Sequence, residues 1–198
     1  MRSRMAMIDA GIDFEVREIS LRDKPASMLS ISPKGTVPVL LLSDGTILEQ
    51  SLDIMLWAYQ NNPVPHRVIL NEQGGIVDAM QAWLTLNDQV FKKLLDAYKY
   101  PERYPTHSRE VTLKQAVEIY LLPIEQKLSK QQFLMGDHLS LVDFALFPFV
   151  RQFMKADEQE FIRLKLTSMN RWMNFFFSSK IFNLAMVKYP TWSEPKQT

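Results

Sequence analysis

Cysteine is absent from the 198-residue chain. A chain without thiols forms no disulfides, thiolate metal sites or iron–sulfur clusters, and it offers no cysteine nucleophile. The absence fits a reducing compartment. An excess of one charge is also lacking, because 23 Lys and Arg stand against 22 Asp and Glu, a net charge of +1. No net field therefore draws the chain to nucleic acid or to an anionic membrane.

Long hydrophobic runs are missing too. Residues 37–42 and 144–150 form the longest apolar runs, well short of the ~20 residues that a membrane-spanning helix needs. The basic start resembles a signal peptide, but Asp9 and Asp13 interrupt the apolar region that should follow. We therefore expect a cytoplasmic protein without membrane or nucleic-acid partners. Three histidines far apart in sequence, at 66, 107 and 138, predict no metal site.

The composition that remains, 46% hydrophobic and 23% charged, is that of a globular protein of one or two domains. Helix formers fill residues 2–10, and Gly11 follows where a left-handed helix cap is favoured. Residues 14–19 alternate apolar and charged side chains, which predicts a half-buried strand. A short helix is expected from Pro25 to about Leu29.

A hairpin is predicted next. Two β-rich runs, 37–42 and 46–49, flank Asp44-Gly45, and glycine adopts the positive φ of a tight turn without steric penalty. From Ser51 the apolar residues recur at helical spacing.

Two prolines and two asparagines in residues 61–65 form a stiff break, which predicts a domain boundary. We expect an α/β domain over residues 1–63, a linker over 64–74 and an all-helical domain over 75–198. The expected helices cover residues 75–98, 108–129, 141–153, 158–177 and 181–187.

Ser140 and Asp143 have the spacing of a capping box. A serine at the N-cap accepts a hydrogen bond from the backbone three residues on, and the acid there accepts one from the backbone of the cap. The residues that follow are apolar on all sides, so this helix should be buried. Both residues are assigned to folding rather than to chemistry.

Val37-Pro38 has two interpretations. It is an ordinary trans proline at the start of a strand, or a cis proline in a turn that leaves the backbone of Val37 open to an extended, peptide-like ligand.

Gln50-Ser51 lies where a strand passes into a helix. The N–H groups of a helix N-terminus favour a carboxylate or phosphate, to which Ser51 and Gln50 could add side-chain hydrogen bonds. Alternatively, Ser51 only caps its helix. Lys34 either reaches a second anionic group or is simply solvated.

Together these motifs resemble the glutathione transferase family. The resemblance rests on Ser32 to Val39, Asp44-Gly45, Gln50-Ser51 and Leu139 to Asp143, in this order along nearly the whole chain. It implies an α/β thioredoxin-like N-terminal domain followed by an all-α C-terminal helical bundle, with glutathione bound at their junction.

The resemblance also implies roles for individual residues. Pro38 is then a cis proline, and the backbone of Val37 pairs with the cysteinyl part of glutathione. Gln50 and Ser51 hold the γ-glutamyl end, and Lys34 is a candidate for the glycyl carboxylate.

The beginning of the chain departs from the family pattern. In the family, a strand and a Tyr, Ser or Cys that activates the glutathione thiol precede the first helix, whereas here Met1 already stands where that helix begins. We therefore expect the first strand and the catalytic residue to be missing from this chain, either because its start is wrongly placed or because a rearranged N-terminal domain tolerates the loss, and we assign no catalytic residue. That strand is normally interior to the sheet, so its loss would leave the backbone groups of its neighbours unpaired.

The leading hypothesis is a glutathione transferase that adds the glutathione thiolate to an apolar electrophile and forms homodimers. One alternative is a non-catalytic binding module of the same fold. Another is a glutaredoxin-like thiol reductase, which requires a cysteine upstream of Met1.

Overall fold

The computed structural model describes residues 1–106 and 108–194. The chain divides into two compact units. The first contains residues 1–64 and, from the other end of the chain, residues 180–194; the second contains residues 65–179. Residues 64–74, expected as a linker, therefore group largely with the second unit, and 180–194 group with the first. The domain boundaries of the sequence analysis remain a prediction.

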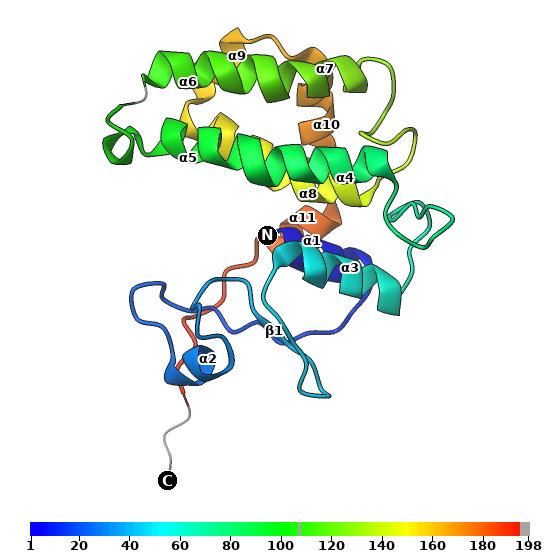
Figure 1. Ribbon diagram of the computed structural model, residues 1–198, viewed down its shortest axis with the longest axis vertical. Coiled ribbons are helices and arrows are strands. Elements are labelled where there is room, and N and C mark those ends of the chain that lie inside the picture. Colours follow the sequence, from blue (N-terminus) through cyan, green and yellow to red (C-terminus); the bar gives the residue numbers. More distant parts are fainter. Residues whose placement is uncertain (107, 195–198) are drawn as a thin grey trace. The chain divides into compact units, whose positions relative to one another are not determined.

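Three helices form the helical layer of the first unit. Helix α1 (Arg2–Asp9) lies beside α3 (Ser51–Asn61) and also contacts α11 (Lys180–Ala185) (Figure 1). The expected cap is present after α1, where Gly11 has a φ of +64°. The helices meet through fully buried apolar side chains, among them Met5, Ala6, Ile54, Met55 and Ala58.

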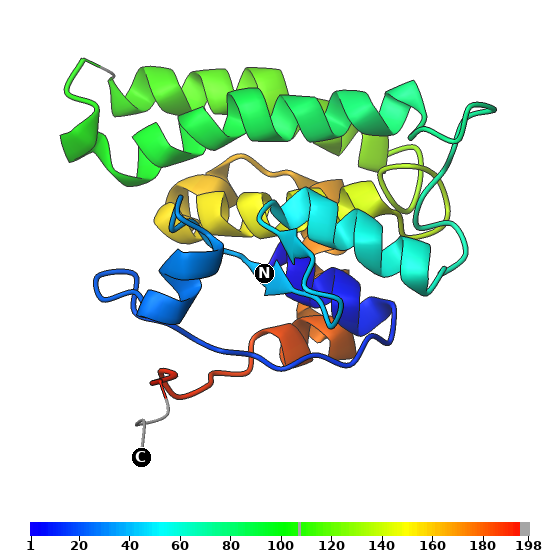
Figure 2. The ribbon, with the colours of Figure 1, turned by 60° about the horizontal axis from the view of Figure 1, so that its bottom comes forward.

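The predicted hairpin is present but shorter than expected. Strands β1 (Leu40–Leu41) and β2 (Ile47–Leu48) pair antiparallel, with Leu40 opposite Leu48 (Figure 2). The turn follows the predicted chemistry, since Gly45 has a φ of +87° and the Asp44 carboxylate accepts a hydrogen bond from the Thr46 N–H at 2.8 Å. Before the hairpin, α2 (Ala26–Ile31) begins after Pro25, as predicted.

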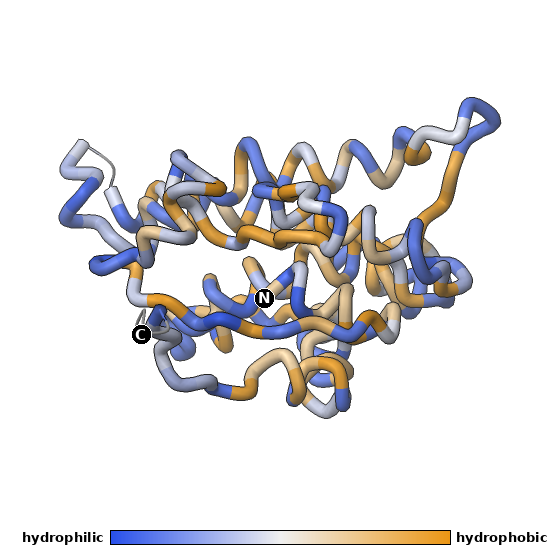
Figure 3. Tube along the Cα trace, turned by 90° about the horizontal axis from the view of Figure 1, so that it is seen from below, coloured by the Kyte–Doolittle hydropathy of each residue, from blue (hydrophilic) through white to orange (hydrophobic). Residues whose placement is uncertain are grey.

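Residues 14–19 do not form the strand that their alternation predicts. The segment is extended, and residues 14–17 alternate between half-buried and exposed. Figure 3 shows the hydropathy of each residue along the backbone. Among the described residues, its backbone pairing within the first unit is limited to one bridge, between Glu18 and Thr191 in the C-terminal tail. A strand requires a continuous backbone partner as well as a half-buried face, and this segment lacks the partner.

The C-terminal tail is held against this extended segment. The Trp192 N–H donates to the Glu18 C=O at 2.7 Å, and the Ser27 N–H donates to the Glu194 carboxylate at 2.8 Å. The Arg17 guanidinium lies over the Trp192 ring, 4.9 Å from its centre. The tail thus contacts the extended segment at Arg17 and Glu18, and α2 at Ser27.

The second unit is all helical in the part that the structure describes, with isolated bridges in its loops. Two long helical stretches lie next to each other (Figure 1), and each contains a π-helical segment in its middle. Helices α4 to α10 in this unit, with the π-helical segments η1 and η3 and the 3₁₀ turn η2, have these bounds: α4 Asp78–Thr85, η1 Leu86–Phe91, α5 Lys92–Lys99, η2 Pro101–Arg103, α6 Arg109–Ala116, η3 Val117–Leu121, α7 Leu122–Leu128, α8 Leu141–Ala156, α9 Glu158–Arg163 and α10 Thr167–Ser178.

Helix α8 forms the centre of the second unit and begins with a capping box. The Asp143 carboxylate accepts hydrogen bonds from the Ser140 N–H at 2.9 Å and from its hydroxyl at 2.7 Å. The same carboxylate accepts from the Leu134 N–H and from the Trp172 indole, both at 2.9 Å. Asp143 is fully buried, and burial raises the pKa of its carboxyl more than these hydrogen bonds lower it.

The helix expected over residues 158–177 is broken in two. Between α9 and α10, Lys165 has a left-handed backbone with a φ of +53°, which a helix cannot contain. The Glu125 carboxylate from α7 accepts hydrogen bonds from the N–H groups of Ser168 and Met169, at 2.9 and 2.7 Å. This tertiary contact therefore satisfies the first backbone N–H groups of α10, so that a second helix can begin after the break at Lys165.

Within residues 1–106 and 108–194, no helix has both the length and the apolar character that crossing a bilayer demands.

Candidate functional site

The hairpin brings two of the sequence motifs to the same end of the first unit. Leu40 lies opposite Leu48, so Val37 and Pro38, which precede β1, and Gln50 and Ser51, which follow β2, lie at the open end of the hairpin. The motifs are far apart in the printed sequence but share one end of the hairpin because the strands are antiparallel.

Val37 presents its backbone at this end. The Val37–Pro38 peptide bond is cis, and half of Val37 is exposed. Neither the N–H nor the C=O of Val37 bonds to any residue within 1–106 and 108–194. Both groups are therefore open to an external partner with an extended backbone.

Helix α3 begins beside this backbone with open donors. Its first internal hydrogen bond runs from the Ile54 N–H to the Gln50 C=O at 3.1 Å, and no side chain caps its start. No described residue accepts from the N–H groups of Ser51, Leu52 or Asp53. These donors and the helix dipole favour an anion at this position.

A buried cation lies next to the start of α3. The Arg2 side chain, from α1, donates to the Ser51 hydroxyl at 3.4 Å, and Arg2 is only 6% exposed. No motif in the sequence indicates Arg2 as a site residue. The sequence shows only a charged residue in a helix that must bury one face. This pattern does not reveal that Ser51, 49 residues further along the chain, is its neighbour.

Lys34 lies near the same end but is engaged within the protein. Its ammonium group is paired with the Glu49 carboxylate at 3.3 Å and is largely exposed. The Ser32 hydroxyl donates to the other oxygen of Glu49 at 2.6 Å. This hydrogen bond, assisted by Lys34, holds the pKa of Glu49 below its ordinary value. The two contacts fasten the loop before Val37 to the residue that precedes Gln50.

The five residues predicted to bind one ligand therefore lie around one end of the hairpin. Gln50 is exposed and Ser51 is half-buried. The arrangement offers an open backbone strand, a helix N-terminus and a buried guanidinium, which together suit a small extended peptide with a carboxylate at one end. The roles of Val37, Pro38, Gln50, Ser51 and Lys34 toward a ligand remain predictions.

Elsewhere, the two described histidines lie close together. His66 and His138, far apart in sequence, stack with ring centres 4.0 Å apart, and His107 lies outside the described residues. In the part of the chain that the structure describes, no cluster of three His, Asp or Glu side chains has the spacing of a metal site.

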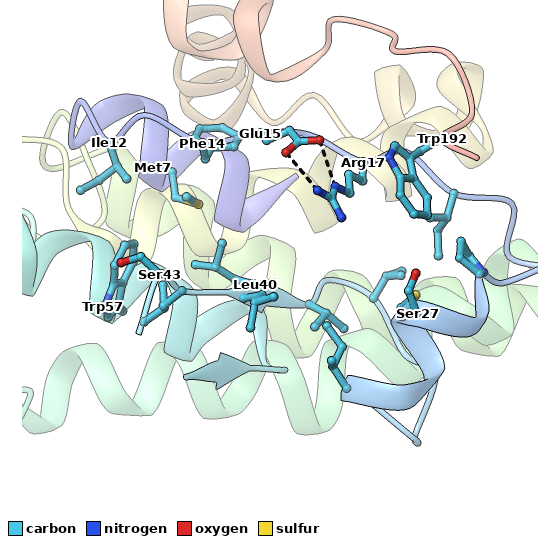
Figure 4. A pocket seen from close by; sticks show the side chains of 18 of the residues that line it. Met7, Ile12, Phe14, Glu15, Arg17, Ser27, Leu40, Ser43, Trp57 and Trp192 are labelled. Atoms are coloured by element: carbon cyan, nitrogen blue, oxygen red, sulfur yellow. Dashed lines mark hydrogen bonds and ion pairs between the residues drawn. The ribbon is translucent and has the colours of Figure 1, made fainter. Parts of the chain in front are cut away.

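A cleft of about 820 Å³ also opens within the first unit. Figure 4 shows Phe14, Glu15 and Arg17 along one wall and Leu40 and Ser43 along the other. Ser27 and Trp192 lie toward one end of the cleft. Val37 contributes to its lining, whereas Gln50 and Ser51 do not.

Comparison with protein families gives two matches that are consistent with this geometry. Residues 1–60 match the model of the glutathione S-transferase N-terminal domain, and residues 112–174 match that of the glutathione S-transferase C-terminal domain. Together the two models span more than half of the chain.

Curated relatives agree with these matches. Glutathione S-transferase U19 of Arabidopsis thaliana is 28% identical over 158 residues, which cover 77% of this chain and 68% of the relative. Glutathione S-transferase GstA of Escherichia coli O157:H7 is 26% identical over 159 residues, which cover 76% of each chain.

Solved structures share the fold. The bacterial glutathione transferase BphK, in a ternary complex, matches with a TM-score of 0.73 and 21% identity over 93% of this chain and 92% of its own. A glutathione S-transferase from Methylobacillus flagellatus KT, solved with glutathione bound, matches with a TM-score of 0.74 and 19% identity over the same shares.

The fold is thus a thioredoxin-like α/β unit and an all-α helical unit, as the sequence analysis predicted. The chain belongs to the glutathione transferase family, and by resemblance to its named relatives it is an enzyme of that family.

Proposed function

We propose that the protein binds glutathione at the open end of the hairpin and adds the glutathione thiolate to an apolar electrophile. The observation that carries the proposal is that two sets of backbone groups are open at one end of the hairpin: the N–H and C=O of Val37, and the first N–H groups of α3. Glutathione is an extended tripeptide with a free α-carboxylate on its γ-glutamyl residue, so its chemistry matches both sets.

Each part of the tripeptide has a partner in this proposal. The cysteinyl residue pairs its backbone N–H and C=O with those of Val37, in the manner of a short added strand. The γ-glutamyl carboxylate accepts from the N–H groups at the start of α3 and from the Ser51 hydroxyl, and the buried Arg2 guanidinium adds a favourable charge. Gln50 binds the same end through its amide, and Lys34 exchanges Glu49 for the glycyl carboxylate.

The protein's contribution to the reaction is to hold the thiol in place. In the reaction, the thiol loses its proton to solvent, the thiolate sulfur forms a bond to the electrophilic carbon, and a leaving group departs from that carbon with its electron pair. Holding the tripeptide at two points reduces the entropic barrier to this encounter. We also propose, from the family, that the protein works in the cytoplasm as a homodimer.

Conjugation of 1-chloro-2,4-dinitrobenzene with glutathione tests the enzymatic part of the proposal, followed by the absorbance of the dinitrophenyl thioether. We expect a rate above the uncatalysed reaction that saturates with glutathione. Glutathione binding without turnover would indicate instead the non-catalytic module of the same fold, and a sample that is folded but binds no glutathione would refute the proposal.

Replacing Ser51 by alanine is expected to weaken glutathione binding about tenfold or more, because one hydrogen bond to a charged group is lost. Isothermal titration calorimetry measures the change. The matched control is Ser43→Ala at the turn end of the same hairpin, which is exposed and should leave the affinity unchanged. Equal affinities for both variants would exclude Ser51 from the site.

A further inference from the structure

The C-terminal tail, residues 188–194, runs through the first unit from α11 toward α2 (Figure 1). Near its start, the Arg4 guanidinium of α1 lies over the Tyr189 ring, 5.5 Å from its centre. Further on, the Trp192 N–H donates to the Glu18 C=O at 2.7 Å. The tail is therefore fixed at two places before it reaches α2.

Glu194 of the tail holds the start of α2. Its carboxylate accepts a hydrogen bond from the Ser27 N–H at 2.8 Å, across 167 residues of sequence. Ser27 lies in the first turn of α2, where N–H groups have no partner within the helix and a negative charge is favourable. The residue at the N-cap of α2 supplies no side-chain hydrogen bond. Because a helix of six residues is marginal by itself, this distant acceptor contributes to its order.

The other end of α2 leads directly into the loop that carries Lys34. The Ser32 N–H donates to the Met28 C=O at 2.9 Å and so continues the last turn of the helix. Gly35 lies against the same helix, since a Cβ at this position would come within 3.2 Å of the Leu29 side chain. The loop is thus fastened to α2 both where it begins and beyond Lys34.

From these contacts we propose that Glu194 is a positioning residue, which holds α2 and, through it, the loop that places Lys34 at the glycyl carboxylate of glutathione. The inference rests on the proposed function. Glu194 bonds to the first turn of α2, whereas Lys34 follows its last turn, so Glu194 acts through the helix. A loop that is ordered before the ligand arrives reduces the entropy lost on binding.

The exposure of Lys34 bounds the size of the effect. Its side chain is 66% exposed, and ion pairs of exposed lysines contribute little, which corresponds to about two- to fivefold in affinity. Glu194 acts by placing this side chain, so its removal should cost no more than the removal of Lys34 itself.

Calorimetry with two ligands tests the assignment in the full chain. One ligand is glutathione, and the other is glutathione ethyl ester, in which the glycyl carboxyl is esterified and uncharged. We expect Glu194→Ala to weaken the binding of glutathione about two- to fivefold and to leave the binding of the ester unchanged. Equal losses for both ligands, or no loss for glutathione, would overturn the assigned role.

Three further variants separate the hydrogen bond from general effects of substitution. Glu194→Gln keeps an acceptor oxygen for the Ser27 N–H, so it should bind glutathione more tightly than Glu194→Ala does. Glu72→Ala removes an exposed carboxylate from the second unit, and Ser193→Ala changes an exposed neighbour in the tail. Both should bind glutathione as the unmodified chain does. A loss in Glu194→Gln as large as in Glu194→Ala would contradict the hydrogen bond as the cause.

A double-mutant cycle tests whether Glu194 acts through Lys34. In a chain that already carries Lys34→Ala, adding Glu194→Ala should cause no further loss of glutathione affinity, because the side chain that Glu194 places is gone. Additive losses would show that the two residues act separately and would refute the proposal.

Amide hydrogen exchange without glutathione measures the fastening itself. In Glu194→Ala, we expect exchange about tenfold or more faster at Ser27, Ser32 and Gly35, and unchanged at Leu42 in the hairpin. Unchanged exchange at the first three amides, in a protein whose unmodified form binds glutathione, would show that the positioning role alone has failed. If the unmodified chain is folded and binds no glutathione, the proposed function itself fails.

Discussion

Removing the carboxyl of Asp143 should lower the free energy of unfolding by about 3–5 kcal/mol, the largest effect of a single substitution that we expect. The Asp143→Ala variant leaves the N–H groups of Leu134 and Ser140 and the indole of Trp172 without their acceptor in a fully buried place. It also opens a cavity beside the start of α8. Urea unfolding measures the loss.

The Asp143→Asn variant should lose less, about 1–3 kcal/mol, because the amide keeps one acceptor oxygen. Asp137→Asn provides the matched control, since Asp137 is exposed and its substitution should change stability little. A loss for Asp143→Asn no larger than for Asp137→Asn would show that the buried carboxylate does not hold this part of the helical unit together.

The difference between the unmodified chain and Asp143→Asn should also depend on pH. Burial raises the pKa of Asp143 in the folded chain, so the contribution of this carboxyl is fully present below its unfolded pKa of about 4. It declines as pH rises through the folded pKa. The destabilisation caused by Asp143→Asn should therefore shrink with rising pH, and growth with pH would contradict the assigned direction.

Placing a carboxylate at the start of α3 should weaken glutathione binding strongly without unfolding the protein. In Ser51→Asp, the new charge repels the γ-glutamyl carboxylate and pairs with Arg2, whose side chain lies 3.4 Å from the Ser51 hydroxyl. We expect an affinity loss of about 100-fold, the effect of replacing an attraction with a repulsion of similar size. An acid in the first turn of a helix is favourable, so thermal stability should hold or increase.

Gln60→Glu is the matched control for this charge. It adds the same charge to the same helix, but near its other end, where Gln60 is exposed. Its glutathione affinity, measured by calorimetry, should equal that of the unmodified chain. If Ser51→Asp binds glutathione as well as Gln60→Glu does, the carboxylate does not bind at the start of α3.

Local signals in the sequence were enough to predict the hairpin and its neighbouring helices. Asp44-Gly45 specifies its turn through side-chain and backbone preferences within a few residues, and the register of the hairpin then brings Val37 and Ser51 to one end. The capping box at Ser140 and Asp143 is similarly local. These features depend on neighbours in sequence, which the pattern contains.

Features that depend on distant partners could not be predicted. The alternation in residues 14–19 indicates a half-buried extended chain, but whether it becomes a strand depends on what lies beside it. Within residues 1–106 and 108–194, the tail pairs with it only at Glu18. The break at Lys165 is supported by Glu125 from another helix, and Arg2 reaches Ser51 across the fold. None of these contacts leaves a periodic signal.

The central claim is that glutathione lies along the Val37 backbone with its γ-glutamyl carboxylate at the start of α3. A titration of the ¹⁵N-labelled protein with glutathione, followed amide by amide by NMR, tests it most directly. We predict saturable shifts at Val37, Ser51, Leu52 and Asp53, with slowed hydrogen exchange at Val37. Saturable binding that leaves these four amides unshifted would contradict the claim.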